Sequence, residues 1–176
     1  MKDVYQKLYD SSDYGRESMN LCPGARLIPH YKHFLRNPIV DLGCGSGDTV
    51  ARLIRNGYKA KGVDWVQTSA YMEVGDITEP LPKFMKGCQT VLCMDVLEHI
   101  ERDSLEGLLD NLALAKSQIV SVHCGSSKWE EEGEELHITQ LSFKEWEELF
   151  FERFQIKEMI TLQPKIRALY LMQTRT

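Results

Sequence analysis

The sequence predicts an α/β fold with a doubly wound, mostly parallel seven-stranded sheet that ends in an antiparallel hairpin. Three observations lead to this prediction. Short apolar segments alternate with segments of helical spacing through residues 39–123, the pattern of parallel strands joined by crossovers. A glycine-rich run over residues 43–47 follows the first of these segments, where open α/β sheets bind ligands. The last two apolar segments, residues 154–160 and 168–172, have no helix between them and therefore pair as a hairpin.

The first half of the chain begins with polar, tyrosine-rich residues. The expected elements are then a helix over residues 25–36, a strand over 39–42, a helix after the glycines that ends at Gly57, a strand over 59–63 and a strand over 71–74. Only residues 65–70 lie between the second and third strands, whereas a parallel crossover needs about a dozen residues. We therefore expect the helix at this crossover to be missing or reduced to a turn.

The second half repeats the alternation with clearer signals. Strands are expected over residues 89–94 and 119–123, and both segments are apolar enough for a buried parallel sheet. Four leucines at positions 105, 108, 109 and 112 mark a helix between them, and Asp103-x-x-Glu106 has the form of a capping box. Ser142-x-x-Glu145 starts the last helix, and a turn at Pro164 joins the final two strands.

The composition fits one globular domain over residues 1–176, with a lead-in over residues 1–36 and a core over residues 37–176. Hydrophobic residues make up 43% of the chain and charged residues 27%. No apolar run is long enough for a membrane span, and the five cysteines form no C-x-x-C pair. We therefore expect a cytoplasmic protein without a membrane partner, either a monomer or a homodimer.

Charge is distributed unevenly along the chain. The net charge is −5, and residues 128–152 alone carry nine acids against two lysines. Proteins that grip duplex nucleic acid usually carry a broad basic face, which this distribution does not provide. We therefore expect a small-molecule partner rather than a nucleic acid.

The glycine run is the most informative motif. Asp41 precedes Gly43, Gly45 and Gly47, which alternate with small residues. The run lacks the Gly-Lys-Ser/Thr ending of a phosphate-binding P-loop, and Val50 stands where the dinucleotide fingerprint read from Gly45 needs its third glycine. The run and its preceding acid resemble motif I of the class I S-adenosylmethionine-dependent methyltransferases.

This resemblance covers residues 37–176 and implies a Rossmann-like methyltransferase fold. It implies that S-adenosylmethionine is the cofactor, that S-adenosylhomocysteine is the product, and that a methyl group passes to an acceptor that the sequence does not identify. The positions that match the family's cofactor contacts are Tyr14, Asp41, Gly43, Cys44, Gly45, Gly47, Asp64, Trp65, Asp76, Ile77, Met94 and Asp95.

The resemblance also implies a role for each acid. Asp41 holds the amino-acid part of the cofactor, and Asp64, at the end of the second strand, accepts hydrogen bonds from the ribose hydroxyls. Asp76 and the backbone of Ile77 recognise adenine, although Gly75-Asp76 is also a good turn pair. In this family the lead-in often closes over the cofactor as a lid, with Tyr14 as its expected contact.

Candidate catalytic residues follow the fourth strand. Residues 94–99, Met-Asp-Val-Leu-Glu-His, resemble the D-x-x-E-H segment of many small-molecule methyltransferases. Glu98 or His99 is suited to act as a base if the acceptor arrives protonated. His137 resembles the histidine that borders the acceptor pocket in such enzymes. The alternative is that Glu98 caps nearby amides and that His99 only packs.

Two further functions stay open. Asp95, Glu98 and His99, with His123 or His137, resemble the metal cluster of the metal-dependent small-RNA 2′-O-methyltransferases, although that family has glutamate at the position of Asp95. The acidic residues 128–152 would repel RNA, and the same segment occurs in many metal-free relatives, so we assign no metal ligands from the sequence. The other alternative is a non-catalytic accessory protein that binds S-adenosylmethionine.

Overall fold

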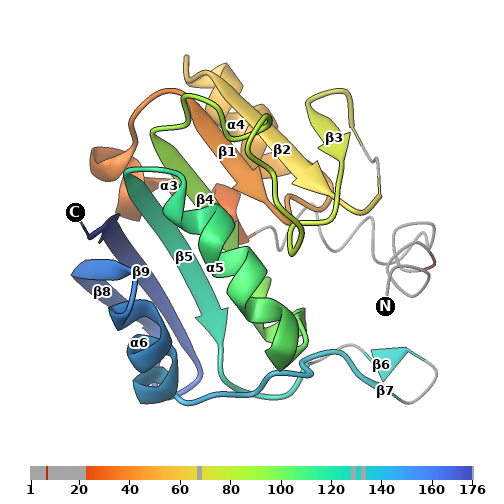
Figure 1. Cartoon of the computed structure of the whole chain (residues 1–176), viewed down its shortest axis with the longest axis vertical. Helices are drawn as coiled ribbons and strands as arrows, with labels where there is room; N and C mark the ends of the chain where they lie inside the picture. Colours follow the sequence, from red (N-terminus) through yellow and green to blue (C-terminus); the bar gives the residue numbers. More distant parts are fainter. Residues whose placement is uncertain (1–6, 8–22, 67–68, 128–129, 132–133, 176) are drawn as a thin grey trace.

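The computed structural model describes residues 7, 23–66, 69–127, 130–131 and 134–175. Its centre is a seven-stranded sheet with the strand order β3-β2-β1-β4-β5-β9-β8 (Figure 1). The strands are β1 (Ile39–Leu42), β2 (Ala60–Asp64), β3 (Met72–Val74), β4 (Thr90–Met94), β5 (Ser117–His123), β8 (Phe154–Gln163) and β9 (Arg167–Thr174). The first five strands pair in parallel, and β9 pairs antiparallel with both β5 and β8.

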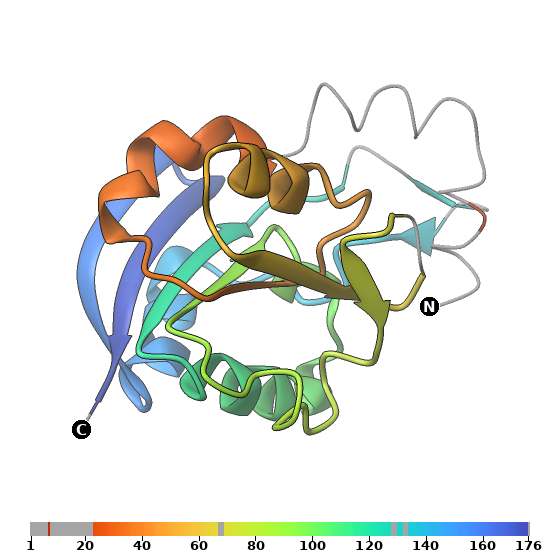
Figure 2. The same cartoon turned by 90° about the horizontal axis from the view of Figure 1, so that it is seen from above.

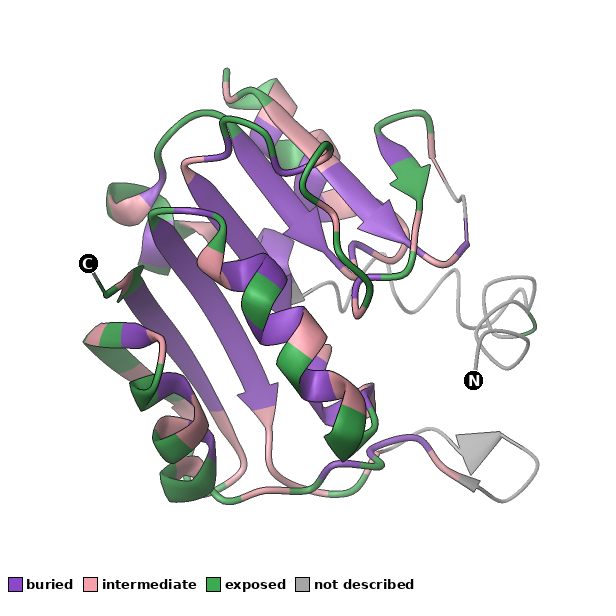
Figure 3. Cartoon of the chain, viewed as in Figure 1, coloured by how far each residue is buried: buried purple, intermediate pink, exposed green. Residues whose placement is uncertain are grey.

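Helices cover both faces of this sheet, so the molecule has three layers (Figure 2). On one face lie α3 (Pro23–Tyr31) and α4 (Asp48–Arg55), and on the other lie α5 (Leu105–Ala113) and α6 (Phe143–Phe151). The central strands and the inward sides of the helices are buried (Figure 3). Within the described residues, no helix has the length and apolar character needed to cross a membrane.

Short elements connect the larger ones. Three single turns of 3-10 helix occur at η1 (Lys32–Phe34), η2 (Leu97–His99) and η3 (Arg102–Ser104). A two-stranded ladder, β6 (Glu130–Glu131) with β7 (Glu134–Glu135), projects beyond the carboxyl ends of the parallel strands (Figure 1). This ladder was not predicted.

The predicted strands and most of the predicted helices are confirmed, with small shifts at their ends. The helix expected over residues 25–36 is α3 followed by η1. The helix start predicted at Ser142 is confirmed, and it is a capping box: the Ser142 side chain accepts from the Glu145 N–H while the Glu145 carboxylate accepts from the Ser142 N–H. The capping box at Asp103 is wrong: Ser104 is the N-cap of α5, and its side chain makes no capping hydrogen bond.

Two crossover helices are missing at the β3 edge of the sheet. The described residues between β2 and β3 contain no helix, as predicted from the short length of this segment. Residues 75–89, between β3 and β4, are all described and form turns rather than a helix; no element was predicted for this segment. As a result, β2 and β3 are covered on the α5 side by a loop alone.

Candidate functional site

The glycine-rich loop joins β1 to α4 in a conformation that favours glycine. Gly43, Gly45 and Gly47 have φ values of +72°, +54° and +78°, which side-chain-bearing residues rarely adopt. A Cβ on Gly43 would lie 2.6 Å from the Cγ2 atom of Val96, in the loop after β4. The glycines therefore keep the loop close to the end of β4 and leave its backbone open to a ligand.

Two buried carboxylates lie beside this loop. Asp41 is 3% exposed and Asp64 is 9% exposed, and the Gly45 N–H donates to Oδ2 of Asp64 at 2.8 Å. Burial raises the pKa of Asp41 to about 7, and the charge of Asp64 adds to the rise. Burial also raises the pKa of Asp64, although backbone N–H groups of Gly45, Trp65 and Val66 oppose it. A bound cation would favour the ionised form of both acids.

Other predicted cofactor contacts lie at the ends of neighbouring strands. Asp76 is exposed after β3, and its Oδ1 atom accepts from the N–H and the hydroxyl of Thr78 at 2.9 and 2.7 Å, which closes a turn. Ile77 is buried next to it, and Trp65 is half-buried after β2. These placements agree with the carboxyl edge as a ligand site, but they also show that Asp76 has a structural role in its turn.

Two of the predicted cofactor residues turn their side chains into the core. Cys44 packs its thiol against Met72 of β3, with 4.0 Å between the two sulfur atoms. Met94 is 7% exposed and belongs to the apolar cluster on the α3 face. A ligand contact from either residue would therefore come from its backbone.

The Asp95 side chain points toward β5 and β9. Asp95 has a left-handed backbone with φ of +55°. Its Oδ1 atom accepts from the Ser121 hydroxyl at 2.6 Å and from Nε of Arg167 at 3.2 Å, and Arg167 also forms an ion pair with Oδ2. Because both oxygens of this carboxylate are already bonded to Ser121 or Arg167, a cofactor contact from Asp95 would also come from its backbone.

Glu98 is fully buried in η2. Its Oε1 atom accepts from the His123 N–H at 3.1 Å, whereas Oε2 is buried and has no hydrogen-bond partner among the described residues. Burial raises the pKa of Glu98 well above its usual value, and the charge of Asp95 adds to the rise. Since a buried acceptor without a partner is costly, the site favours either a protonated carboxyl or a cation beside it.

Three imidazoles gather beside Glu98. The ring centroids of His99 and His137 are 4.7 Å apart, and those of His137 and His123 are 4.9 Å apart. Nδ1 of His99 lies 2.9 Å from the Leu136 carbonyl oxygen, and Nδ1 of His137 lies 2.5 Å from that of Gly125. Because a carbonyl oxygen only accepts, the neutral forms of His99 and His137 carry the proton on Nδ1 and the lone pair on Nε2.

The charge state of this cluster follows from its burial. Burial lowers the pKa of His99 to about 4, and the neighbouring His137 adds to the effect. Burial also lowers the pKa of His123. One ligand atom each from Glu98, His99 and His137 lies within 4.8 Å of the others. At neutral pH His99 therefore offers an uncharged imidazole nitrogen close to a carboxyl group, an arrangement suited to a base or to a metal ion.

Hydrogen bonds between η2 and residues 136–139 hold the cluster together. The Thr139 N–H donates to the Glu98 carbonyl at 3.0 Å, and the Thr139 hydroxyl donates to the Ile100 carbonyl at 2.6 Å. With the bond from His99 to Leu136, these contacts explain how residues far apart in sequence meet. Thr139 and Arg167 were missed by the sequence analysis. The pairing of His123 with Arg167 across β5 and β9 places the arginine beside Asp95, and only the strand register reveals it.

The predicted residues thus form two groups at one edge of the sheet. Asp41, the glycines and Asp64 form the first group, and Glu98, His99 and His137 form the second. The contact between Gly43 and Val96 joins the loops that carry them. Tyr14 lies outside the described residues.

Comparisons by sequence found no relatives: no protein-family model and no curated protein matches the chain. Solved structures, in contrast, match over nearly the whole chain. A TehB-like SAM-dependent methyltransferase from Corynebacterium glutamicum aligns with a TM-score of 0.68 and 16% identity, covering 93% of this chain and 97% of that one. Magnesium protoporphyrin IX methyltransferase from Synechocystis, with bound SAH, aligns with a TM-score of 0.64 and 14% identity, covering 98% and 94%.

A third similar structure is the methyltransferase domain of the bacterial protein CtHen1-C. It aligns with a TM-score of 0.66 and 13% identity, covering 87% of this chain and 97% of that one. At identities this low, the structural alignments establish the fold alone. The chain has the fold of the class I methyltransferases, with the predicted seven-stranded sheet and its antiparallel final pair.

Proposed function

Starting from the class I methyltransferase fold, we propose that this chain is a cytoplasmic enzyme that transfers a methyl group from S-adenosylmethionine to a small-molecule acceptor. The observation that carries the proposal is the pair of buried acids, Asp41 and Asp64, beside three left-handed glycines. Buried carboxylates are costly unless they are paired. S-adenosylmethionine brings an ammonium and a sulfonium group, so it supplies positive charge to these two acids.

The residues at the edge fit the parts of this cofactor. Asp41 is suited to the ammonium group, and Asp64 accepts the ribose hydroxyls in addition to the Gly45 N–H that it already binds. The glycine loop has no Cβ atoms at Gly43 and Gly47, where they would collide with neighbouring side chains. The loop backbone is therefore free to approach a ligand closely.

The bound cofactor supplies an electrophilic methyl group on its sulfonium sulfur. The work left to the protein is to align the acceptor with that carbon and to remove a proton where the acceptor carries one. His99 and His137 are suited to the second task because their Nε2 lone pairs are fixed by the Nδ1 hydrogen bonds. The low pKa of His99 keeps its ring neutral at physiological pH.

Calorimetric titration with S-adenosylhomocysteine tests cofactor binding. We expect a Kd on the order of micromolar for the wild type and a loss of at least about ten-fold in Asp64→Ala. The matched control is Asp110→Ala, which removes an exposed acid on α5 and should leave the Kd unchanged. Failure of the wild type to bind would overturn the proposal.

Methyl transfer itself separates an enzyme from a non-catalytic cofactor-binding protein. The assay follows labelled methyl from S-adenosylmethionine into a panel of small acceptors. We expect His99→Gln to slow transfer by about 10² or more while it retains the wild-type affinity for S-adenosylhomocysteine. Cofactor binding without transfer to any acceptor would favour the accessory role.

A second candidate function rests on the same cluster. Glu98 has a buried oxygen without a partner among the described residues, and the Nδ1 atoms of His99 and His137 face carbonyl groups. Metal-bound histidines almost always donate their second N–H in this way. We propose as the alternative that a divalent ion such as Zn²⁺, Mn²⁺ or Co²⁺ binds here. It would act as a Lewis acid in 2′-O-methylation of RNA. The net negative charge of residues 128–152 weighs against RNA as the acceptor.

Titration with Co²⁺ alone tests this alternative without an acceptor, because bound Co²⁺ has a characteristic visible spectrum. We expect a metal-dependent enzyme to bind one ion and to lose it in His137→Ala. Replacing His33, an exposed histidine outside the cluster, is the control. Methyl transfer that withstands chelation would reject the metal-dependent function.

A further inference from the structure

The loop between β3 and β4 carries the residues expected to recognise adenine. It spans residues 75–89, takes the place of a crossover helix, and contains Asp76 and Ile77 near its start. The loop must hold a fixed position relative to the strand ends, because the backbone groups expected to bind adenine belong to it.

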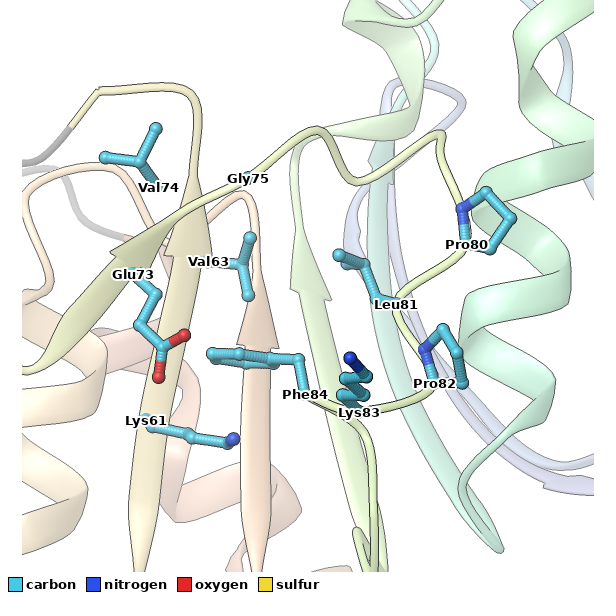
Figure 4. Close-up of a pocket in the computed structure, with 10 residues that line it drawn as sticks. All are labelled: Lys61, Val63, Glu73, Val74, Gly75, Pro80, Leu81, Pro82, Lys83 and Phe84. Carbon is cyan, nitrogen blue, oxygen red and sulfur yellow. The ribbon is translucent and has the colours of Figure 1, made fainter.

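The sheet supports the loop only in part. Ile77, near the start of the loop, packs in the same apolar core as Val63 of β2, but the next residues are less closely packed on the strands. Between the loop and strands β2 and β3 lies an open hollow of about 440 Å³. Figure 4 shows Val63 of β2 facing Leu81 and Phe84 of the loop across this hollow. The Lys61 ammonium lies 3.5 Å from the centroid of the Phe84 ring, and this is a partly solvated contact. Packing against the sheet is therefore incomplete along the loop, and a second support comes from the side.

Helix α5 supports the loop from the side, and Asn111 makes the polar contacts of this support. Asn111 is 2% exposed, and its Nδ2 atom donates to the carbonyl oxygens of Ile77 at 2.8 Å and Glu79 at 2.7 Å. Its Oδ1 atom accepts from the Leu81 N–H at 3.0 Å. One carboxamide therefore satisfies three backbone groups, and it reaches them from a helix that is anchored in the main core.

A glycine one helical turn earlier makes this approach possible. A Cβ on Gly107 would overlap the Thr78 carbonyl oxygen, so α5 and the loop are in direct backbone contact at this point. Gly107 and Asn111 lie on the same face of α5 because they are four residues apart. Together they set both the distance and the orientation of residues 77–81.

We propose that Asn111 is a positioning residue for cofactor recognition, which holds the Asp76–Ile77 backbone at the height required to bind the adenosine half of the cofactor. The inference rests on the proposed function, since it assigns a role within the same site. Asn111 does not touch the ligand. It acts through the carbonyl group of Ile77, whose own N–H is the expected adenine contact.

The test compares two ligands by calorimetry: S-adenosylhomocysteine, and 5′-methylthioadenosine, which lacks the amino-acid part. Asn111→Ala should raise the Kd of both by about ten-fold, because the defect lies at the adenosine half that they share. Asp41→Asn, in contrast, should weaken S-adenosylhomocysteine and leave 5′-methylthioadenosine almost unchanged. Gly107→Ala should act like Asn111→Ala, because it pushes the same loop away from α5.

Gln118→Ala is a matched control for folding and stability. Gln118 is also a fully buried carboxamide, and its Nε2 atom makes three hydrogen bonds, to Leu112, Ala115 and Thr174, away from the cofactor loop. It should lower the melting temperature about as much as Asn111→Ala and leave both Kd values unchanged.

Asn111→Asp divides the role of the carboxamide further. Aspartate keeps the acceptor for the Leu81 N–H but sets a carboxylate against the carbonyl oxygens of Ile77 and Glu79. We therefore expect it to bind both ligands at least as weakly as Asn111→Ala does.

The outcomes separate this inference from the proposed function. If the wild type binds neither ligand, the proposed function fails. If the wild type binds both and Asn111→Ala binds them equally well, the positioning role is wrong and the function stands. If Gln118→Ala weakens binding as much as Asn111→Ala does, the effect is one of general stability and the positioning role is also wrong.

Discussion

The ligand-free protein should become less stable as pH rises because of Asp41, and Asp41→Asn should remove that loss. Burial raises the pKa of Asp41 from 3.8 to about 7, so the folded state keeps a proton that the unfolded chain releases. Its stabilising contribution is complete below pH 3.8 and is lost as pH rises through about 7. Each pH unit between the two pKa values changes the free energy of unfolding by about 1.4 kcal/mol. The contribution of Asp41 therefore falls by about 4 kcal/mol from low to high pH, and about 2 to 3 kcal/mol of this fall occurs between pH 5 and 7.5.

Urea denaturation of the wild type and Asp41→Asn at these two pH values measures the effect. Titrating groups remote from Asp41 contribute equally to both proteins, so the difference between them reports Asp41 together with its coupling to Asp64. We expect the variant to gain about 2 to 3 kcal/mol on the wild type as pH rises from about 5 to about 7.5. Asp103→Asn, at an exposed acid, is the control. A difference that is constant, or that shrinks with pH, would refute the reasoning.

Three other predictions follow from the same geometry. In urea denaturation, Gly43→Ala should lower the free energy of unfolding by at least about 1 kcal/mol more than Gly57→Ala does. Both have positive φ, but a Cβ collides with a side chain only at Gly43; equal losses would contradict this. Arg167→Ala should lower stability by about 2 to 3 kcal/mol and be partly rescued by Asp95→Ala, because the single change leaves that acid unpaired; no rescue in a double-mutant cycle would reject the pair. The rate of methyl transfer should stay level through pH 6.5 and fall only toward the His99 pKa of about 4; a fall centred near pH 6.5 would exclude this histidine as the base.

The sheet could be predicted because each strand carries its own local signal. The segments at Ile39–Leu42 and Thr90–Met94 are mostly apolar and are buried on both faces, and such segments predict a strand from their own residues alone. The Ser142 capping box is equally local. The loop over residues 75–89 was not predicted as the replacement for a helix, because its fixed shape depends on Asn111, which lies on another element.

The candidate site was predictable in its residue types but not in its connections. Motif resemblance found Asp41, Asp64 and Glu98 because each lies at a strand end or in a short turn after one. It could not show that the Asp95 carboxylate is held by Arg167, since that contact depends on how β9 is aligned against β5. Pairings of this kind arise from tertiary register and leave no periodic trace in the sequence.

The central claim is that S-adenosylmethionine binds at the carboxyl edge of the parallel strands. Amide NMR spectra of isotope-labelled protein, recorded with increasing S-adenosylhomocysteine, test both the binding and its location. We predict that the largest shifts occur at Gly43, Gly45, Gly47 and Ile77, with saturation at micromolar ligand, on the order expected for a cofactor. Spectra that do not change, or changes confined to the hollow between Lys61 and Phe84, would contradict the claim.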